Sequence, residues 1–394
     1  MTLFLASVSS SQEAELAING GADIVDFKDP AKGALGALEL SVVRATVKAI
    51  AGRRPASAVI GDLPMKPESI VSAVETMAAT GVDYVKVGLF AGPERENCVR
   101  RLAPLARRIR IVGVIFADSD PDGELVPLMA ECGFAGAMID TARKNGGRLL
   151  DQMNLAAVDR FVRSCRSHGL LAGLAGSLEA ADVPRLLLLS PDYLGFRTAL
   201  CDRHDRLAGL DPAALNLIRG LISQDPRGNE VERPKRENTD YWLVAARGYS
   251  GEPTHDSTTT DRVLVHDFEV SMRVGAYENE REKEQRVRFN VNAEVIRATK
   301  PAQDMRDVLS YDVITDGIRL IVAEGHIPLL ETLAERVAKL ALDHPQVQRV
   351  TVKVEKIEVG SGRVGVEITR ERPAGVAKVF HLFPTAAGKG KSTE

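Results

Sequence analysis

Three lysines in the first half of the chain lie in or just after short apolar segments. Lys28 follows IVDF, Lys86 lies within YVKVGL, and Lys144 lies within MIDTARKNGG. A buried lysine is costly unless it is paired or deprotonated, and a neighbouring cation lowers its pKa, which leaves free amine to attack a carbonyl. The three lysines together predict Schiff-base chemistry on a small aldehyde.

Carboxylates accompany these lysines at the ends of the apolar segments: Asp26, Asp62, Asp118 and Asp140. Because side chains alternate along a strand, Asp26 shares a face with Lys28. Asp140 closes its segment and Lys144 lies in the loop that follows, so a proton acceptor and an ammonium can reach one substrate. The alternative is that each lysine forms an internal ion pair with Asp26, Asp62 or Asp140.

Two glycine-containing segment ends, LAGS and LGFRT, predict a site for a phosphate group. Gly176 and Ser177 lie in the first and Arg197 lies in the second. Many parallel barrels bind phosphate through backbone N–H groups after their seventh and eighth strands, and Arg197 could add a charge-assisted contact. The alternative is that these glycines serve only for close packing.

The candidate residues belong to eight short apolar segments that alternate with amphipathic, helix-patterned stretches. The segments cover 3–8, 23–29, 56–62, 84–89, 110–118, 136–141, 170–177 and 193–198. Strand followed by helix, repeated eight times, is typical of a parallel α/β protein, and a chain of about 220 residues fits a closed (βα)8 unit. We therefore predict a TIM barrel over 1–223, with the lysines and carboxylates at its C-terminal mouth.

The pattern changes in the second half of the chain. A polar, proline-containing stretch over 224–260 predicts a linker with a short docking segment around Trp242. From 261 to 375, two alternating strands, two helices and two further strands predict an α+β domain of ββααββ order. Its exposed strand edges favour self-association, so we expect a homo-oligomer. Residues 376–394 are predicted to be a C-terminal tail, disordered from Ala386 onward.

Composition narrows the classes of partner. A net charge of -3 gives no general attraction to nucleic acid, and 44% hydrophobic with 27% charged residues is typical of a protein that needs no membrane. The first residues lack a basic leader, so we expect a cytoplasmic location. The four cysteines form no CxxC pair and are expected to be reduced thiols. The seven histidines show no metal-ligand spacing, so neither a metal nor another cofactor is predicted.

A family resemblance is carried by five barrel motifs: GGADIVDFKDPAKGALGA, AVIGDLPMKP, GVDYVKVGLF, AMIDTARKNGG and GLAGSL. Together they resemble the (5-formylfuran-3-yl)methyl phosphate synthases. The resemblance implies that two glyceraldehyde 3-phosphate molecules condense, losing phosphate and water, to a furan precursor of methanofuran-type one-carbon carriers. It also implies that Lys28 is the Schiff-base lysine, supported by Lys86, Asp140 and Lys144. A general lysine aldolase acting on another phosphorylated aldehyde is the alternative.

Four motifs of the second domain carry another resemblance: VGAYENEREKEQRV, SYDVI, PLLETLAERVA and VKVEK. Together they resemble the dihydroneopterin aldolases, whose T-fold subunits form rings with pterin sites between neighbours. The resemblance implies that Glu331 anchors a pterin ring, that Tyr311 and Lys356 handle protons in a retro-aldol step, and that Glu280 lies nearby. The alternative is a domain that serves only as an assembly scaffold.

Overall fold

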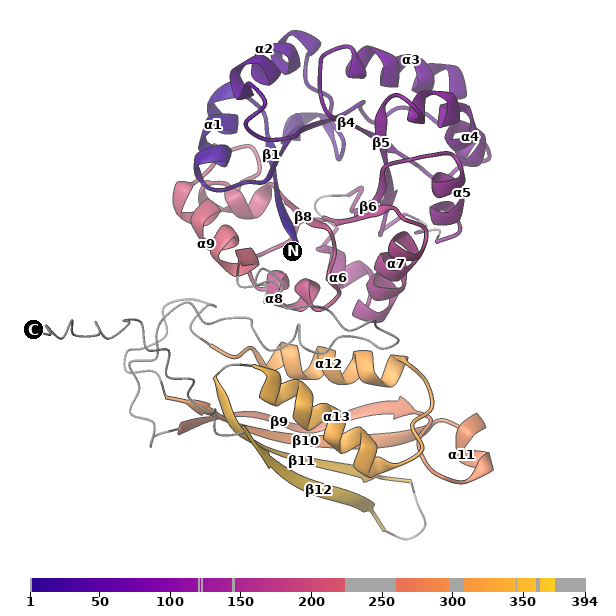
Figure 1. Cartoon of the computed structure of the whole chain (residues 1–394), viewed down its shortest axis with the longest axis vertical. Helices are drawn as coiled ribbons and strands as arrows, with labels where there is room; N and C mark the ends of the chain where they lie inside the picture. The colour runs from indigo at the N-terminus through magenta and orange to yellow at the C-terminus, as the bar shows by residue number, and fades with distance from the viewer. Residues whose placement is uncertain are drawn as a thin grey trace, which may run out of the picture.

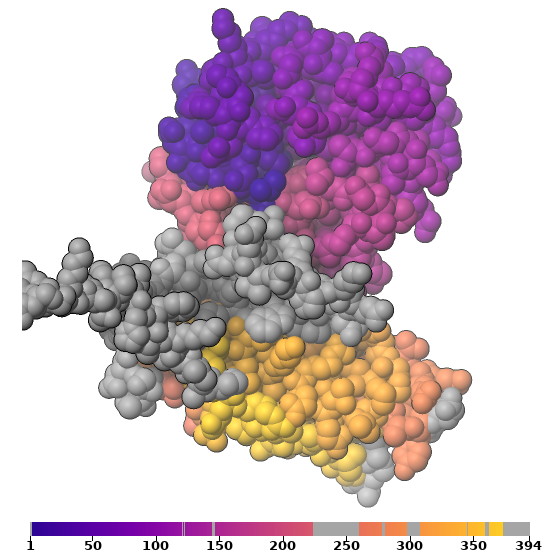
Figure 2. All heavy atoms as spheres, in the orientation of Figure 1, coloured from indigo at the N-terminus to yellow at the C-terminus, as the bar shows by residue number. Residues whose placement is uncertain are grey.

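The computed structural model describes residues 2–119, 121, 123–143, 146–223, 260–297, 308–344, 346–358 and 362–372. The predicted catalytic Lys144, the segment around Trp242, the predicted linker up to Thr259 and the predicted tail lie outside the described residues. The described atoms form two bodies, one from the first half of the chain, in indigo to pink, and one from the second, in orange and yellow (Figure 2). None of the described helices is long and apolar enough to cross a membrane.

Eight parallel strands close into a barrel in the first body, as the alternating pattern predicts (Figure 1). They are β1 (Leu3–Val8), β2 (Ile24–Phe27), β3 (Ala56–Val59), β4 (Tyr84–Gly88), β5 (Arg110–Phe116), β6 (Gly136–Asp140), β7 (Leu171–Leu174) and β8 (Tyr193–Phe196). Each strand pairs with the next, and β8 pairs with β1. The strands read as nearly continuous apolar runs because the helices cover their outer face.

Helices surround the barrel and present an apolar stripe to it. They are α1 (Ser11–Asn19), α2 (Leu40–Ile50), α3 (Pro67–Ala78), α4 (Arg95–Ala106), α5 (Leu125–Glu131), α6 (Leu149–Gln152), α7 (Leu155–Ser167), α8 (Asp182–Leu187) and α9 (Pro212–Ser223), with single 3₁₀ turns at Pro30–Lys32, Thr198–Leu200 and Asp202–His204. In α7 the buried residues recur at helical spacing: Leu155, Val158, Phe161, Val162 and Cys165. The Ser10 and Asn154 side chains cap the starts of α1 and α7.

The second body is an antiparallel sheet covered on one face by two helices (Figure 1). Its elements are β9 (Thr260–Met272), α11 (Glu278–Glu282), β10 (Gln285–Ile296), α12 (Tyr311–Ala323), α13 (Leu330–Asp343), β11 (Val347–Lys356) and β12 (Val364–Glu371). The sheet order is β12-β11-β10-β9, so the predicted ββααββ order is confirmed with one added short helix, α11. Alternate residues of β10 are buried: Val287, Phe289, Val291 and Ala293.

The two bodies meet through helices on the outer wall of the barrel. Helix α12 packs against α7 and α8. Arg185 of α8 and Asp316 of α12 form an ion pair across this contact, in which the carboxylate is almost completely buried. The mouth of the barrel therefore stays clear of α12, because this helix lies against the barrel's side (Figure 1).

Candidate active site

A pocket at the C-terminal mouth of the barrel gathers two lysines and two aspartates. Asp26 and Lys28 come from the end of β2, Lys86 from β4, and Asp140 from the last position of β6. All four are buried, with Asp26 fully inaccessible to solvent. These charged side chains meet because the C-terminal ends of parallel strands converge at one mouth of a barrel.

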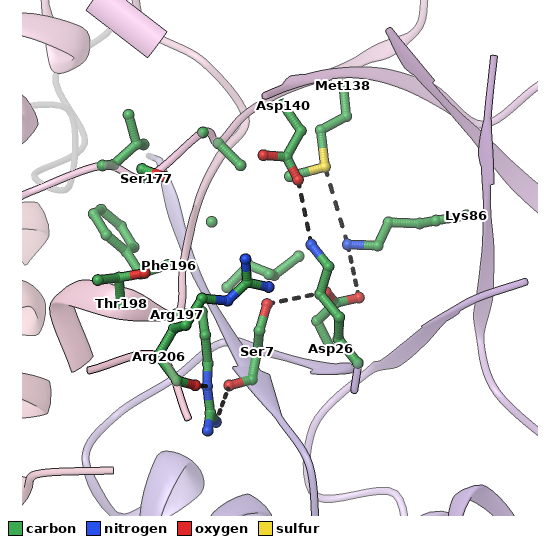
Figure 3. Close-up of a pocket in the computed structure, with 16 residues that line it drawn as sticks. Ser7, Asp26, Lys86, Met138, Asp140, Ser177, Phe196, Arg197, Thr198 and Arg206 are labelled. Carbon is green, nitrogen blue, oxygen red and sulfur yellow. Dashed lines mark hydrogen bonds and ion pairs between the residues drawn. The ribbon is translucent and has the colours of Figure 1, made fainter. Parts of the chain in front are cut away.

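The four side chains form two ion pairs. Lys86 Nζ lies 2.7 Å from Asp26 Oδ1, and Lys28 Nζ lies 3.3 Å from Asp140 Oδ2. The close-up shows the first pair and the Asp140 carboxylate directed into the same space (Figure 3). Two of the three predicted lysines, Lys28 and Lys86, therefore share one pocket, and each also forms an internal ion pair of the kind the alternative describes.

Asp26 is held by two hydroxyl groups from the neighbouring strands. Ser7 Oγ donates to Asp26 Oδ2 at 3.1 Å, and Ser57 Oγ donates to Oδ1 at 2.6 Å. Ser7 and Ser57 are the residues paired with Asp26 in β1 and β3, so strand register alone brings the three side chains together. A carboxylate that accepts these hydrogen bonds stays fixed beside Lys86.

Burial dominates the acid–base behaviour of Lys86. Loss of solvation lowers the pKa of its ammonium, the Asp26 carboxylate opposes this shift, and the charge of Lys28 adds to it. The pKa is lower than the ordinary lysine value on balance. Lys86 therefore loses its proton more readily than an exposed lysine and can exchange it with a bound substrate.

Asp62 and Asp118, which were predicted to bind substrate, do not line this pocket; their carboxylates accept hydrogen bonds from backbone amides instead. The Asp62 carboxylate accepts from the amides of Ala34 and Leu35, at 3.1 and 2.9 Å, in the loop after β2. Asp118 accepts from the amides of Ala142 and Arg143, at 2.7 and 2.8 Å, in the loop after β6. Although burial opposes the shift, these amide bonds lower the pKa of Asp118. Both aspartates shape loops at the mouth.

The predicted phosphate end of the pocket is lined by Gly176, Ser177 and Arg197, but the Arg197 guanidinium is engaged by other protein groups. Gly176 and Ser177 have positive φ values of 116° and 49°, so the chain makes a tight left-handed turn at the pocket wall. The Arg197 guanidinium instead pairs with Glu13 at 2.6 Å and donates to the carbonyl groups of Ser7, Arg206 and Ala208. Its donors are thus used inside the protein.

Arg206, which the sequence patterns do not single out, supplies the missing cation. Its guanidinium points into the pocket (Figure 3), and its Nε is buried without a hydrogen-bond partner among the described residues. Burial lowers the pKa of Arg206, and the Asp140 carboxylate opposes that shift. In sequence Arg206 lies in CDRHDRLAGL, which reads as a solvated surface loop. The concentration of cations after the eighth strand is the one signal that could have revealed it.

A second candidate site lies at one end of the C-terminal sheet. Lys356, the last residue of β11, pairs with Glu280 of α11, and the Glu280 carboxylate also accepts from the Tyr277 amide at 3.1 Å. The Lys356 ammonium lowers the pKa of Glu280. Gly275, at φ 136°, is required beside this carboxylate, because a Cβ atom there would collide with it.

Tyr311 and Glu331 are not brought to this pair within one chain. Tyr311 is 61% exposed at the first position of α12, and Glu331 is exposed in the first turn of α13. In the parts of the chain that the structure describes, neither side chain bonds to Glu280 or Lys356. The described residues also contain no group of three His, Cys, Asp or Glu side chains arranged to hold a metal ion.

Comparison with known proteins gives a match for each domain. The sequence profile of the 4-HFC-P synthase family matches residues 4–219, and that of dihydroneopterin aldolase matches residues 263–369. A putative (5-formylfuran-3-yl)methyl phosphate synthase of Methylorubrum extorquens is 44% identical over 225 residues, covering 57% of this chain and 93% of the relative. The (5-formylfuran-3-yl)methyl phosphate synthase of Methanopyrus kandleri is 38% identical, covering 52% of this chain and 92% of the relative.

Solved structures similar to the C-terminal domain include two dihydroneopterin aldolases. That of Burkholderia thailendensis, bound to guanine, is 34% identical, covers 28% of this chain and 91% of the solved chain, and has a TM-score of 0.26. That of E. coli, in complex with neopterin, is 28% identical, covers 28% of this chain and 98% of the solved chain, and has a TM-score of 0.25.

Proposed function

Because the chain belongs to the 4-HFC-P synthase family through residues 4–219, we propose that its barrel condenses two glyceraldehyde 3-phosphate molecules to (5-formylfuran-3-yl)methyl phosphate. Phosphate and water are lost, so no redox step is needed. The observation that carries the proposal is the pair of buried lysines, each beside a carboxylate, in one pocket. In this role the barrel serves the synthesis of methanofuran-type carriers.

Imine formation at Lys28 begins the proposed sequence. The amine adds to the aldehyde carbon of one triose phosphate, and water leaves as the C=N bond forms. The protonated imine withdraws electrons from the neighbouring carbon, whose proton passes to Asp140, 3.3 Å from Lys28 Nζ. The enamine then adds to the aldehyde of the second triose phosphate, while Lys86 protonates the new alkoxide. Elimination of phosphate, dehydration and imine hydrolysis complete the turnover.

Arg206 and the Gly176–Ser177 turn are proposed to hold the phosphate group of a substrate. The unpartnered Nε of Arg206 and the left-handed turn face the same space as the amines. A guanidinium can bind phosphate through paired N–H groups, and backbone amides in such a turn add further donors. Lys144 is assigned to the acid–base set on its position in the sequence after Asp140 and on the family resemblance.

Trapping with borohydride tests the imine. Incubation with glyceraldehyde 3-phosphate and borohydride is expected to add a triose to Lys28, identified by peptide mass, while untreated enzyme releases phosphate and gains furan absorbance. Lys28→Arg keeps the charge beside Asp140 but cannot form the imine, so both signals should disappear. A trapped adduct on Lys86 would move the nucleophile to that residue, and wild-type activity in Lys28→Arg would remove the imine from the mechanism.

The C-terminal domain is proposed to cleave dihydroneopterin by a retro-aldol reaction to glycolaldehyde and a hydroxymethyl-dihydropterin. Support comes from the dihydroneopterin aldolase profile and from the Lys356–Glu280 pair, which can exchange a proton with a substrate hydroxyl. Glu331 would accept paired N–H bonds from the pterin edge. Since Tyr311 and Glu331 lie apart from the pair in one chain, we propose that neighbouring subunits of a homo-oligomer complete the site.

A matched pair of lysine variants on β11 tests this second activity. Lys356→Met should abolish cleavage of dihydroneopterin by the full chain, while Lys353→Met should leave it intact, because Lys353 instead pairs with Glu355. Furan formation serves as the folding control for both. If the wild-type chain assembles but does not cleave dihydroneopterin, the domain is the scaffold of the alternative interpretation.

A further inference from the structure

Asp316 is a buried carboxylate whose partners come from both domains. Its side chain is 1% exposed on α12. Arg319, one turn later on the same helix, donates to Oδ1 at 2.8 Å. Arg185 of the barrel helix α8 donates through Nε to Oδ2 at 2.5 Å and through Nη2 to Oδ1 at 3.4 Å. A two-point bond from a guanidinium fixes orientation as well as distance, so α12 constrains α8.

Helix α8 follows directly after the turn that faces the barrel pocket. Its first residue, Asp182, is almost completely buried and accepts from the Glu179 amide at 2.9 Å and from Arg148 Nη1 at 3.3 Å. Within the turn, the Gly176 carbonyl accepts from the amide of Leu149, the residue after Arg148, at 2.9 Å. These bonds tie the pocket turn to the start of α8.

Helix α8 is short, so its two ends are coupled closely to each other. The helix has six residues, so Asp182 at its start and Arg185 in its last turn lie within one helical turn of each other. A helix this short has little stability of its own and depends on its packing partners. Displacement of Arg185 is therefore expected to shift Asp182, and with it Glu179 and Arg148, which flank the turn and the residue bonded to it.

We propose that Asp316 is a positioning residue for the barrel reaction, through which the C-terminal domain holds the Gly176–Ser177 turn in its phosphate-binding geometry. The ligand is a phosphate monoester, and this part of the inference rests on the proposed function. The C-terminal domain thus has a task in the first reaction that is separate from any pterin chemistry of its own. Asp316 touches no substrate and acts only through Arg185 and α8.

The test compares variants of the full chain in two measurements. The first is the affinity for inorganic phosphate by calorimetry, and the second is hydrogen exchange of the amides over residues 174–188. Asp316→Asn is expected to weaken phosphate binding about 3- to 30-fold, the range for residues that act through a network, and to speed exchange in the turn. Arg185→Gln removes the same bond from the barrel side and should give the same result if the C-terminal domain is intact.

Two further variants separate positioning from general damage. Arg319→Gln removes the partner of Asp316 within its own domain, together with the contact of this guanidinium with the Phe268 ring, but it leaves the bond between the domains in place. Phosphate affinity and exchange should therefore stay near wild type. The exchange of charges, Arg185→Asp with Asp316→Arg, should restore most of the lost affinity. Unchanged affinity and exchange in both Asp316→Asn and Arg185→Gln would overturn the proposal.

Failure of the proposed function looks different. If borohydride and glyceraldehyde 3-phosphate leave the wild-type chain unlabelled, the imine chemistry is wrong, but exchange in the turn still reports whether Asp316 positions it. Suppose that borohydride traps glyceraldehyde 3-phosphate on the wild-type chain, and that the Asp316→Asn variant traps non-phosphorylated glyceraldehyde as efficiently as wild type. The defect of the variant then lies in phosphate binding and not in imine formation. That combination is the expected result.

Discussion

At the scale of single residues, each buried charge in the pocket depends on a partner of opposite charge. Asp26 accepts hydrogen bonds from two serine hydroxyl groups and forms an ion pair with the Lys86 ammonium. Replacing Asp26 with a neutral residue therefore leaves a buried cation without a counter-ion. Removing one partner of a buried pair costs far more than removing one partner of an exposed pair. The residue that matters for chemistry therefore also matters for stability.

Asp26→Asn is expected to lower the free energy of unfolding by about 3 kcal/mol at neutral pH, because Lys86 must then stay charged without a partner or give up its proton. Urea unfolding measures the change. Glu96→Gln is the control, since Glu96 pairs with Arg100 on the surface of α4 and should contribute less than about 1 kcal/mol. An equal decrease in the free energy of unfolding in the two variants would mean that the buried ion pair stabilises the protein no more than the exposed pair does.

The lowered pKa of Lys86 also predicts that the stability of the protein depends on pH. Its folded pKa lies below the ordinary value of 10.5, so between the two values the unfolded chain binds more protons than the folded chain. Its contribution to stability is therefore fully present above 10.5 and is lost as pH falls through the folded pKa. Lys86→Met should flatten this rise in unfolding free energy relative to wild type, whereas Lys48→Met, on the exposed face of α2, should leave it unchanged. Parallel curves for wild type and Lys86→Met would contradict the lowered pKa.

At the scale of elements, close packing inside the barrel leaves no room for small additions. Gly173 of β7 faces the ring of Tyr193 on β8, and a Cβ atom at this glycine would overlap the ring. Gly173→Ala should cost about 1–3 kcal/mol, as expected for overpacking, measured by urea or thermal unfolding. Gly92→Ala meets no atom within 4 Å and should change stability by less than about 0.5 kcal/mol. A neutral Gly173→Ala would show that Tyr193 can move aside.

The elements were largely predictable from sequence, and the site was predictable in part. Strand β1 has the bounds that the apolar pattern predicts, because period and length are local properties. The partners of Arg197 are not local, since Glu13 lies 184 residues away in the chain. Asp62 and Asp118 fit a site by position, but only the folded loops present the backbone amides that bind them. Arg206 was missed for the same reason, because its burial depends on tertiary structure.

At the scale of the whole molecule, the C-terminal sheet ends in two edge strands, β9 and β12. Edge strands expose unpaired N–H and C=O groups, which favours pairing with another chain. We expect the full chain to form a closed homo-oligomer at micromolar concentration, with the mass measured by light scattering after size exclusion. The docking of α12 on the barrel leaves both edges available for this. A monomer across that concentration range would contradict the prediction and leave the site of Lys356 without its proposed neighbour.

The bonds from Ser7 and Ser57 to Asp26 have a consequence for how this pocket could be changed. A slip of one residue between β1, β2 and β3 would reverse which side chains point inward, and it would leave these three polar groups without one another. The aspartate that pairs with Lys86 thus also favours the observed alignment of three strands. Anyone redesigning the chemistry at this position must first supply another way to align the barrel.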